Sequence, residues 1–234
     1  MTLAELRKEF RSQGDAKIAE HSQRFFKTGE GEYGAGDRFL GMRVPVVRKF
    51  AKQHTDMTLR QLLAFLKSPY HEERLLACIA LAALYKRGDE NVKREVYESY
   101  VANLDYVNNW DMVDGSAHLI VGPWLQEKSR KPLYSLAKRK DLWRRRVAIM
   151  STYHYIRLGD FDDTLGIAEI LLGDDEDLIH KATGWMLREV GNRDRPTEEA
   201  FLKKHYLNMP RTMLRYAIEK FPESRRKAYL NGKV

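Results

Sequence analysis

The chain has 234 residues, of which 43% are hydrophobic, and a formal net charge of +8. This hydrophobic fraction excludes a disordered chain and is sufficient for a folded core. The basic excess favours polyanionic partners such as nucleic acid or anionic membrane, although many basic proteins have no such partner.

Several function classes are disfavoured by simple counts. The single cysteine, Cys78, cannot form an internal disulfide, and its apolar neighbours predict that it is buried. The seven histidines are scattered and form no His-x-x-x-His pair, so we expect neither a metal nor a cofactor. No apolar run approaches the roughly 20 residues that span a bilayer, and charged residues interrupt the first helix at residues 3–10. We therefore expect a cytoplasmic protein without membrane contact.

After the N-terminal helices, residues 28–43 contain five glycines and predict a long loop. Loops of this length are often functional, but a plain insertion has the same composition. The loop follows no predicted strand and has no Walker pattern, so it is not a phosphate-binding loop of that type.

From residue 74 onward, the helical periodicity repeats. One polar residue stands near the start of each long helix, at intervals of about 35 residues. These anchors are Arg74, Asp111, Arg146, Lys181 and Arg215. Shorter helices are predicted between them, at residues 90–102, 132–138, 162–171 and 197–206.

A helix-pair repeat of this length predicts an all-α fold, an α-α superhelix (solenoid) of HEAT-like repeats. We expect residues 1–234 to form one such domain. One helix of each pair lines the concave surface of a solenoid. The anchors should therefore share that surface and make it a basic cleft, because four of the five are basic.

Two tryptophans fall at related places in this repeat. Trp110 and Asp114 are four residues apart and share a helix face. Trp185 follows its anchor, Lys181, by four residues. Core packing is the ordinary role of tryptophan, and we expect it for Trp124 and Trp143.

The polar neighbours of Trp110 argue against a sealed core there, whereas Asp114 alone would also fit a solvated surface acid. Arg146 is the anchor of the repeat between the two tryptophans. Two indoles, a carboxylate and nearby arginines describe a site for a cationic group on a polyanion, which points to damaged DNA.

Residues 107–114, 143–148 and 182–191 resemble the AlkD family of HEAT-like-repeat DNA glycosylases, which remove alkylated purines, and residues 33–45 resemble a loop of that family. The resemblance covers nearly the whole chain. It implies that Trp110, Asp114 and Trp185 are the catalytic-cleft residues. It also implies that Arg145 or Arg146 holds the DNA backbone, and we favour Arg146 because it is a repeat anchor. An aromatic residue near the family's cleft corresponds to Phe25 or Phe26.

The chemistry suits these residues. Alkylation at N3 or N7 makes a purine cationic and a good leaving group. A carboxylate at Asp114 opposes the positive charge that develops on the sugar and orients water. Indole rings favour a cationic base by about 0.5–2 kcal/mol. No lysine context marks a lyase nucleophile, so we predict a monofunctional glycosylase.

The resemblance further implies that the lesion stays stacked in the duplex without conventional base flipping. We expect double-stranded DNA as partner, a monomer, and phosphate contacts from a set of basic residues: Arg145, Arg146, Lys181, Arg188 and Arg215. Residues 138–140 and Arg193 are further candidates. The preferred lesion stays open among 3-methyladenine, 7-methylguanine and bulkier adducts.

Two rival functions remain at this stage. One is a non-enzymatic HEAT-repeat DNA-binding protein, which the presence of all three cleft residues disfavours. The other is a protein-binding scaffold, the common use of α-solenoids, which the basic anchors disfavour.

Overall fold

The computed structural model describes residues 1–234. All its regular structure is helical, apart from one isolated bridge between Arg38 and Tyr70, so the predicted all-α class is confirmed. The contacts divide the chain into two compact units, residues 1–116 and 117–234. The single domain expected for residues 1–234 stays a prediction. None of the helices is long and apolar enough to cross a bilayer.

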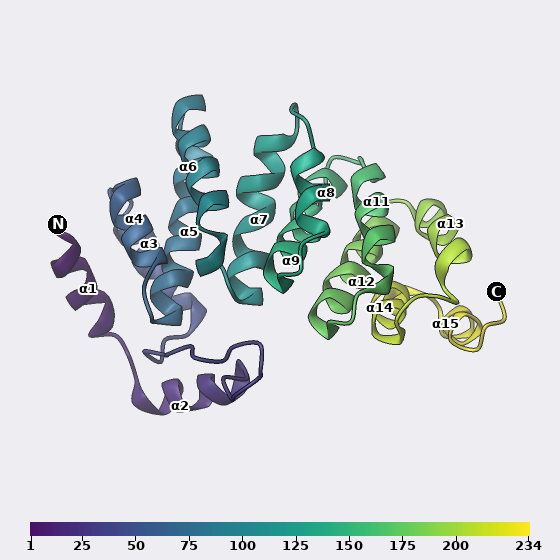
Figure 1. The fold of residues 1–234 in the computed structure, drawn as a ribbon, viewed down its shortest axis with the longest axis horizontal. Helices are drawn as coiled ribbons and strands as arrows, with labels where there is room; N and C mark the ends of the chain where they lie inside the picture. Colours follow the sequence, from purple (N-terminus) through teal and green to yellow (C-terminus); the bar gives the residue numbers. More distant parts are fainter. The chain divides into compact units, whose positions relative to one another are not determined.

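In the first unit, the chain packs around one central helix (Figure 1). Helix α5 is buried over most of its circumference and packs against α3, α4 and α6, as expected for a helix that is apolar on several faces. The elements of this unit are α1 (Leu3–Arg11), α2 (Ala16–Phe25), α3 (Val44–Gln53), α4 (Leu59–Leu66), α5 (His71–Arg87), α6 (Glu90–Ala102), the 3-10 turn η1 (Leu104–Tyr106) and the start of α7 (Trp110–Leu125).

Helix α2 differs from its neighbours because it buries none of its residues. It lies apart from α3–α6 in Figure 1, at the start of the loop that leads to α3. The loop is fixed on the first turn of α5: the Glu72 carboxylate accepts hydrogen bonds from the backbone N–H groups of Leu40, Gly41 and Met42, at 2.8–3.1 Å. Gly41 has φ +84°, and a Cβ there would lie 1.8 Å from the Asp15 carbonyl oxygen, so this close approach requires glycine.

The second unit is arranged around α12, which packs against α9, α13 and α14. The approach of α12 to α14 depends on Gly184, because a Cβ there would lie 2.3 Å from the Met213 carbonyl oxygen. The elements of the second unit are the end of α7, α8 (Lys131–Ala137), α9 (Leu142–Ser151), α10 (Tyr153–Ile156), α11 (Asp162–Ile170), η2 (Leu171–Gly173), α12 (Asp177–Gly191), α13 (Arg195–His205), α14 (Arg211–Ala217), η3 (Ile218–Lys220) and α15 (Glu223–Leu230).

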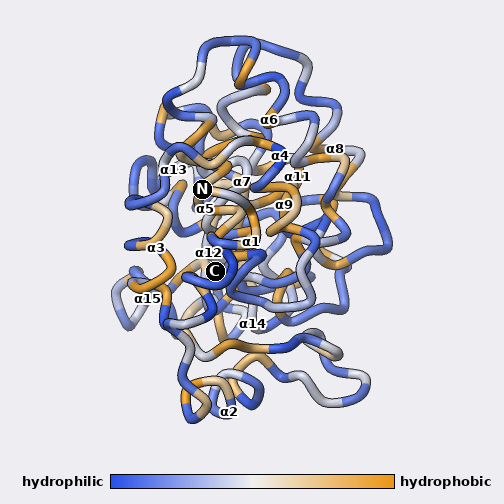
Figure 2. The backbone as a smooth tube through the Cα atoms, turned by 90° about the vertical axis from the view of Figure 1, so that its left-hand side faces the viewer, coloured by the Kyte–Doolittle hydropathy of each residue, from blue (hydrophilic) through white to orange (hydrophobic).

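The order of helix pairs follows the prediction, but the lengths do not alternate throughout, because α14 (Arg211–Ala217) is shorter than α13 before it and begins five residues earlier than the helix expected at residues 216–221. The four short helices expected from the sequence are α6, α8, α11 and α13, with ends within two residues of the expected ones. Figure 2 shows the alternation of hydrophilic and hydrophobic residues along the helices that makes them detectable.

Two of the four basic anchors, which were expected to line the concave surface, are buried. Arg74 and Arg146 are 4% and 5% exposed. Arg74 donates to the Ser68 carbonyl oxygen and to Asp37, and Arg146 donates to the Leu178 carbonyl oxygen. Both terminal nitrogens of Arg74 are thus paired, which offsets much of the cost of burying the charge, whereas its buried Nε has no hydrogen-bond partner.

Candidate functional site

Trp110 is the first residue of α7, and its position is set by local hydrogen bonding. The Asn109 side-chain oxygen accepts a hydrogen bond from the Trp110 backbone N–H at 2.8 Å. Asn109 is fully buried, which fixes the point where the helix begins. The half-buried indole therefore projects from a defined place in the first unit.

Aromatic rings from the N-terminal segment surround this indole. Phe26 stacks on Trp110 with a centroid distance of 5.4 Å and an interplanar angle of 23°. Phe25 meets Trp110 edge-on at 6.1 Å and is 57% exposed. Phe39, from the glycine-rich loop (residues 28–43), stacks on Phe26 with a centroid distance of 5.2 Å. Such offset and edge-on contacts are the favourable geometries for aromatic pairs.

These rings line a pocket of about 740 Å³ in the first unit. Met42 and Leu75 add apolar surface, whereas His71 and Asp111 bring polar groups into the lining. An apolar pocket with a few polar groups is the usual form of a site for a planar organic group. The family resemblance left open whether Phe25 or Phe26 is the aromatic residue near the cleft, and both of them contact Trp110.

A buried group of ions lies under this pocket. The His71 ring contacts Asp111 at 2.8 Å through Nε2 and Asp37 at 3.3 Å through Nδ1. Arg74 also donates to Asp37, at 2.6 Å. All four side chains are less than 10% exposed. We call these four residues the buried ion cluster.

Burial opposes the charge of His71, but the two carboxylates outweigh it and raise its pKa to about 9. Burial likewise opposes the charge of Asp37, and the contacts with His71 and Arg74 nevertheless lower its pKa. The protonated His71 ring can thus donate from both nitrogens, to Asp111 and to Asp37. The cluster links α5, the glycine-rich loop and the start of α7.

Asp114 lies one turn after Trp110 on α7 and is half-buried. Burial is the main cause that raises the pKa of Tyr100 well above its usual value, and the charge of Asp114 adds to this effect. Apart from its chain neighbours and its own helix backbone, nothing lies within 4 Å of the position that a Cβ would take at the neighbouring Gly115. The Asp114 carboxylate thus lies near the buried Tyr100, and the next residue, Gly115, leaves the adjoining helix surface uncovered by a side chain.

Trp185 lies in the second unit, on α12, in more polar surroundings. Its Nε1 donates to the Glu189 carboxylate at 3.3 Å, and Tyr153 is the nearest ring, with centroids 6.5 Å apart. Arg193 donates to the same carboxylate at 2.8 Å and lies 5.8 Å from the Tyr153 ring centroid. Glu189 therefore joins the indole to a cation.

Two of the arginines predicted to bind DNA are engaged within the second unit. Arg145 donates to both carboxylate oxygens of Asp174, at 2.6 and 3.2 Å. Arg146 is buried, and its donor reaches the Leu178 carbonyl oxygen. Their phosphate contacts stay predictions, and the observed contacts hold neighbouring segments together.

Of the other three predicted DNA-binding residues, Lys181 and Arg215 lie closer to solvent, and Arg188 is about as buried as Arg145. Lys181 pairs with Asp177 at 2.7 Å one turn earlier on α12, and Arg188 pairs with Glu219. Arg215 is exposed on α14. The Lys181 pair is exposed and can exchange partners at little cost, whereas the Arg188 side chain is only 15% exposed. The roles of these residues also stay predictions.

The sequence reasoning missed the buried ion cluster. His71 lies 40 residues before Asp111 in the chain, and no local spacing rule joins them. The sequence did single out Arg74 and Asp111 as repeat anchors, but it gave no sign that they meet His71 or Asp37 of the glycine-rich loop. No group of three or more His, Cys, Asp or Glu side chains is arranged to hold a metal ion.

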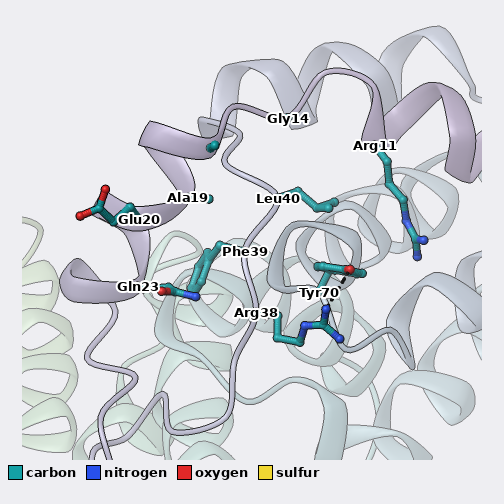
Figure 3. A pocket seen from close by; sticks show the side chains of 10 residues that line it. Arg11, Gly14, Ala19, Glu20, Gln23, Arg38, Phe39, Leu40 and Tyr70 are labelled. Atoms are coloured by element: carbon teal, nitrogen blue, oxygen red, sulfur yellow. Dashed lines mark hydrogen bonds between the residues drawn. The ribbon is translucent and has the colours of Figure 1, made fainter.

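A second hollow, of about 630 Å³, lies beside Phe39 (Figure 3). Arg11 and Arg38 lie over the Tyr70 ring, with distances to its centroid of 4.9 and 4.8 Å. Arg38 also donates to the Tyr70 hydroxyl at 3.2 Å, whereas Glu73 neutralises Arg11. These contacts join the glycine-rich loop to the start of α5.

Comparisons with known proteins agree with the helical architecture. Residues 6–221 match the sequence model of a family described as "DNA alkylation repair enzyme". A solved structure described as "Predicted DNA alkylation repair enzyme from Enterococcus faecalis" superposes with a TM-score of 0.69 and 19% identity. The alignment covers 90% of this chain and 98% of that one, so the two share a fold. No curated protein matches this sequence.

Proposed function

This chain belongs to the DNA alkylation repair enzyme family, and we propose that it is a monofunctional DNA glycosylase. Its substrates are cationic N3- or N7-alkylated purines in duplex DNA. The observation that carries this proposal is the start of α7, where Trp110 is stacked in an aromatic pocket and Asp114 follows one turn later. An aromatic surface and a carboxylate on one helix are the two groups that this hydrolysis needs.

The reaction breaks the bond between C1′ of the deoxyribose and the purine nitrogen. The bonding electrons go to the base, which neutralises its positive charge, and C1′ becomes oxocarbenium-like. The ionised Asp114 opposes that charge and orients water, whose oxygen bonds to C1′ while its proton is lost to solvent. No amine forms a covalent bond to the sugar, so strand cleavage is not part of this reaction.

The indoles of Trp110 and Trp185 contribute to recognition. An aromatic face near an alkylpurine attracts its positive charge by about 0.5–2 kcal/mol, which gives modest discrimination against neutral purines. The intrinsic lability of the cationic base supplies the rest. We propose that the lesion reacts while stacked, in contrast to glycosylases that flip the base into a closed pocket.

Release of free base from methylated duplex DNA tests this function. Wild-type protein should release 3-methyladenine or 7-methylguanine, and Asp114→Asn should lower the single-turnover rate by about 10²-fold or more. Asp56→Asn is the matched control, because Asp56 is exposed in the same unit and has no place in the mechanism. Equal rates for Asp114→Asn and wild type would reject the role of Asp114.

A non-enzymatic DNA-binding protein is the second candidate, favoured by the net charge of +8. Both candidates predict binding to duplex DNA that weakens steeply with salt. Wild-type protein that binds methylated duplex but releases no base would favour the second candidate. Absence of binding at low salt would reject both.

A further inference from the structure

The short connection between α8 and α9 carries an unusual concentration of positive charge. Lys138, Arg139 and Lys140 are consecutive and exposed, and Arg144 follows in the first turn of α9. Together with Asp141 these side chains line a hollow of about 600 Å³ in the second unit. We call residues 138–140 the basic loop.

Charge in this hollow is poorly balanced by the protein itself. Asp141 is its one carboxylate and is already engaged, since it caps α9 by accepting from the Arg144 backbone N–H at 2.8 Å and pairs with the Arg144 side chain at 3.5 Å. None of the three basic-loop side chains forms an ion pair with a carboxylate. Cations held this close repel one another, and an anion in the hollow relieves the repulsion.

The backbone of the basic loop is fixed from behind. Arg145 donates from Nη1 to the carbonyl oxygens of Arg139 and Lys140. Its Nε and Nη2 donate to the two oxygens of Asp174, whose side chain is 6% exposed. Arg145 therefore bridges the loop carbonyl oxygens and the Asp174 carboxylate. The three basic side chains of the loop take no part in these bonds and lie at the surface.

We propose that the hollow binds the phosphodiester backbone of duplex DNA, and that Arg145 and Asp174 are positioning residues for the basic loop. The inference rests on the proposed function for its choice of polyanion. Lysine and arginine side chains are suited to phosphate oxygens, and backbone contacts fix the register of a protein on a duplex without reading sequence. Arg145 thus acts on DNA through the loop that it holds.

Salt-dependent binding tests the contact. The dissociation constant of undamaged duplex is measured over a range of KCl concentrations for wild type and K138Q/R139Q/K140Q. Loss of two or three phosphate contacts should reduce the slope of log K against log salt by about 2–3, since each contact contributes about 0.9. The matched control is R157Q/K203Q/K233Q, which removes the same charge from exposed positions in the same unit and should change the slope by less than about 1.

Asp174→Asn tests the positioning role, because charge and geometry predict opposite results. The substitution makes the protein more positive, so a purely electrostatic effect would tighten DNA binding. If Asp174 orients Arg145 and hence the loop, binding should instead weaken by about threefold to tenfold. Asp174→Glu should restore much of the affinity, and thermal unfolding checks that each variant is folded.

An unchanged salt slope in the triple variant, or the same slope change in its control, would overturn the proposal. Tighter binding by Asp174→Asn would overturn the positioning role. Binding to phosphatidylserine vesicles in place of duplex, lost in the triple variant, would assign the hollow to a membrane surface and overturn it too. Base release by wild type separates this proposal from the glycosylase proposal. If the triple variant has a reduced salt slope but wild type releases no base, only the glycosylase proposal is rejected. If wild type releases base but the triple variant has an unchanged slope, only the phosphate site is rejected.

Discussion

Trp110 and Trp185 are both half-buried residues on long helices, but they are held in different ways. Trp110 is packed between aromatic rings above the buried ion cluster. Trp185 donates one hydrogen bond to Glu189, and its ring centroid lies 6.5 Å from that of Tyr153. The first arrangement depends on buried charge and ring packing, and the second depends on polar contacts close to solvent.

This difference predicts where each site is vulnerable. A buried ion cluster contributes little net stability when complete, but removal of one member leaves an opposite charge without compensation in a low dielectric. An ion pair near solvent is replaced by water when it is broken, and the loss is small. Damage to the cluster should therefore affect both the stability of the first unit and the position of Trp110.

His71→Ala should have the largest effect. It leaves Asp37 and Asp111 buried with only Arg74 as a counter-ion, so the free energy of unfolding should fall by about 3–5 kcal/mol. Urea denaturation measures this change. His21→Ala is the control, because it removes an exposed histidine from the same unit, and it should cost about 1 kcal/mol or less. Equal losses in the two variants would contradict the special role of the cluster.

The pH dependence of stability should report the same residue. The folded-state pKa of His71 is raised to about 9 from its ordinary value of 6.5, so the folded protein holds a proton that the unfolded chain releases between these values. This contribution is fully present below about pH 6.5 and is lost as pH rises through about 9. The melting temperature of wild type should therefore fall across this interval, whereas His71→Gln should fall less. Parallel curves for the two proteins would show that another group titrates.

The cluster also illustrates what the sequence could and could not predict. The extent of α6 followed from its periodicity and its flanking residues, and the spacing of Trp110 and Asp114 put them on one helix face, because both features are local. The contact of His71 with Asp111 depends on how α5 packs beside α7, which no spacing encodes. The burial of Arg146 escaped prediction for the same reason, since its partner is the Leu178 carbonyl oxygen on another helix.

Glu189→Gln should have the smallest effect and tests the other side of the comparison. Glutamine keeps an oxygen that accepts from the Trp185 indole but loses the charge that pairs with Arg193. Because the Arg193 side chain is 32% exposed, water replaces the lost partner, and the free energy of unfolding should change by less than about 1 kcal/mol. If the hydrogen bond alone positions the indole, the single-turnover rate should stay within about threefold of wild type, and Glu189→Ala should lower it further. A large loss in Glu189→Gln would mean that the charge of Glu189, and not its hydrogen bond, is what the Trp185 site requires.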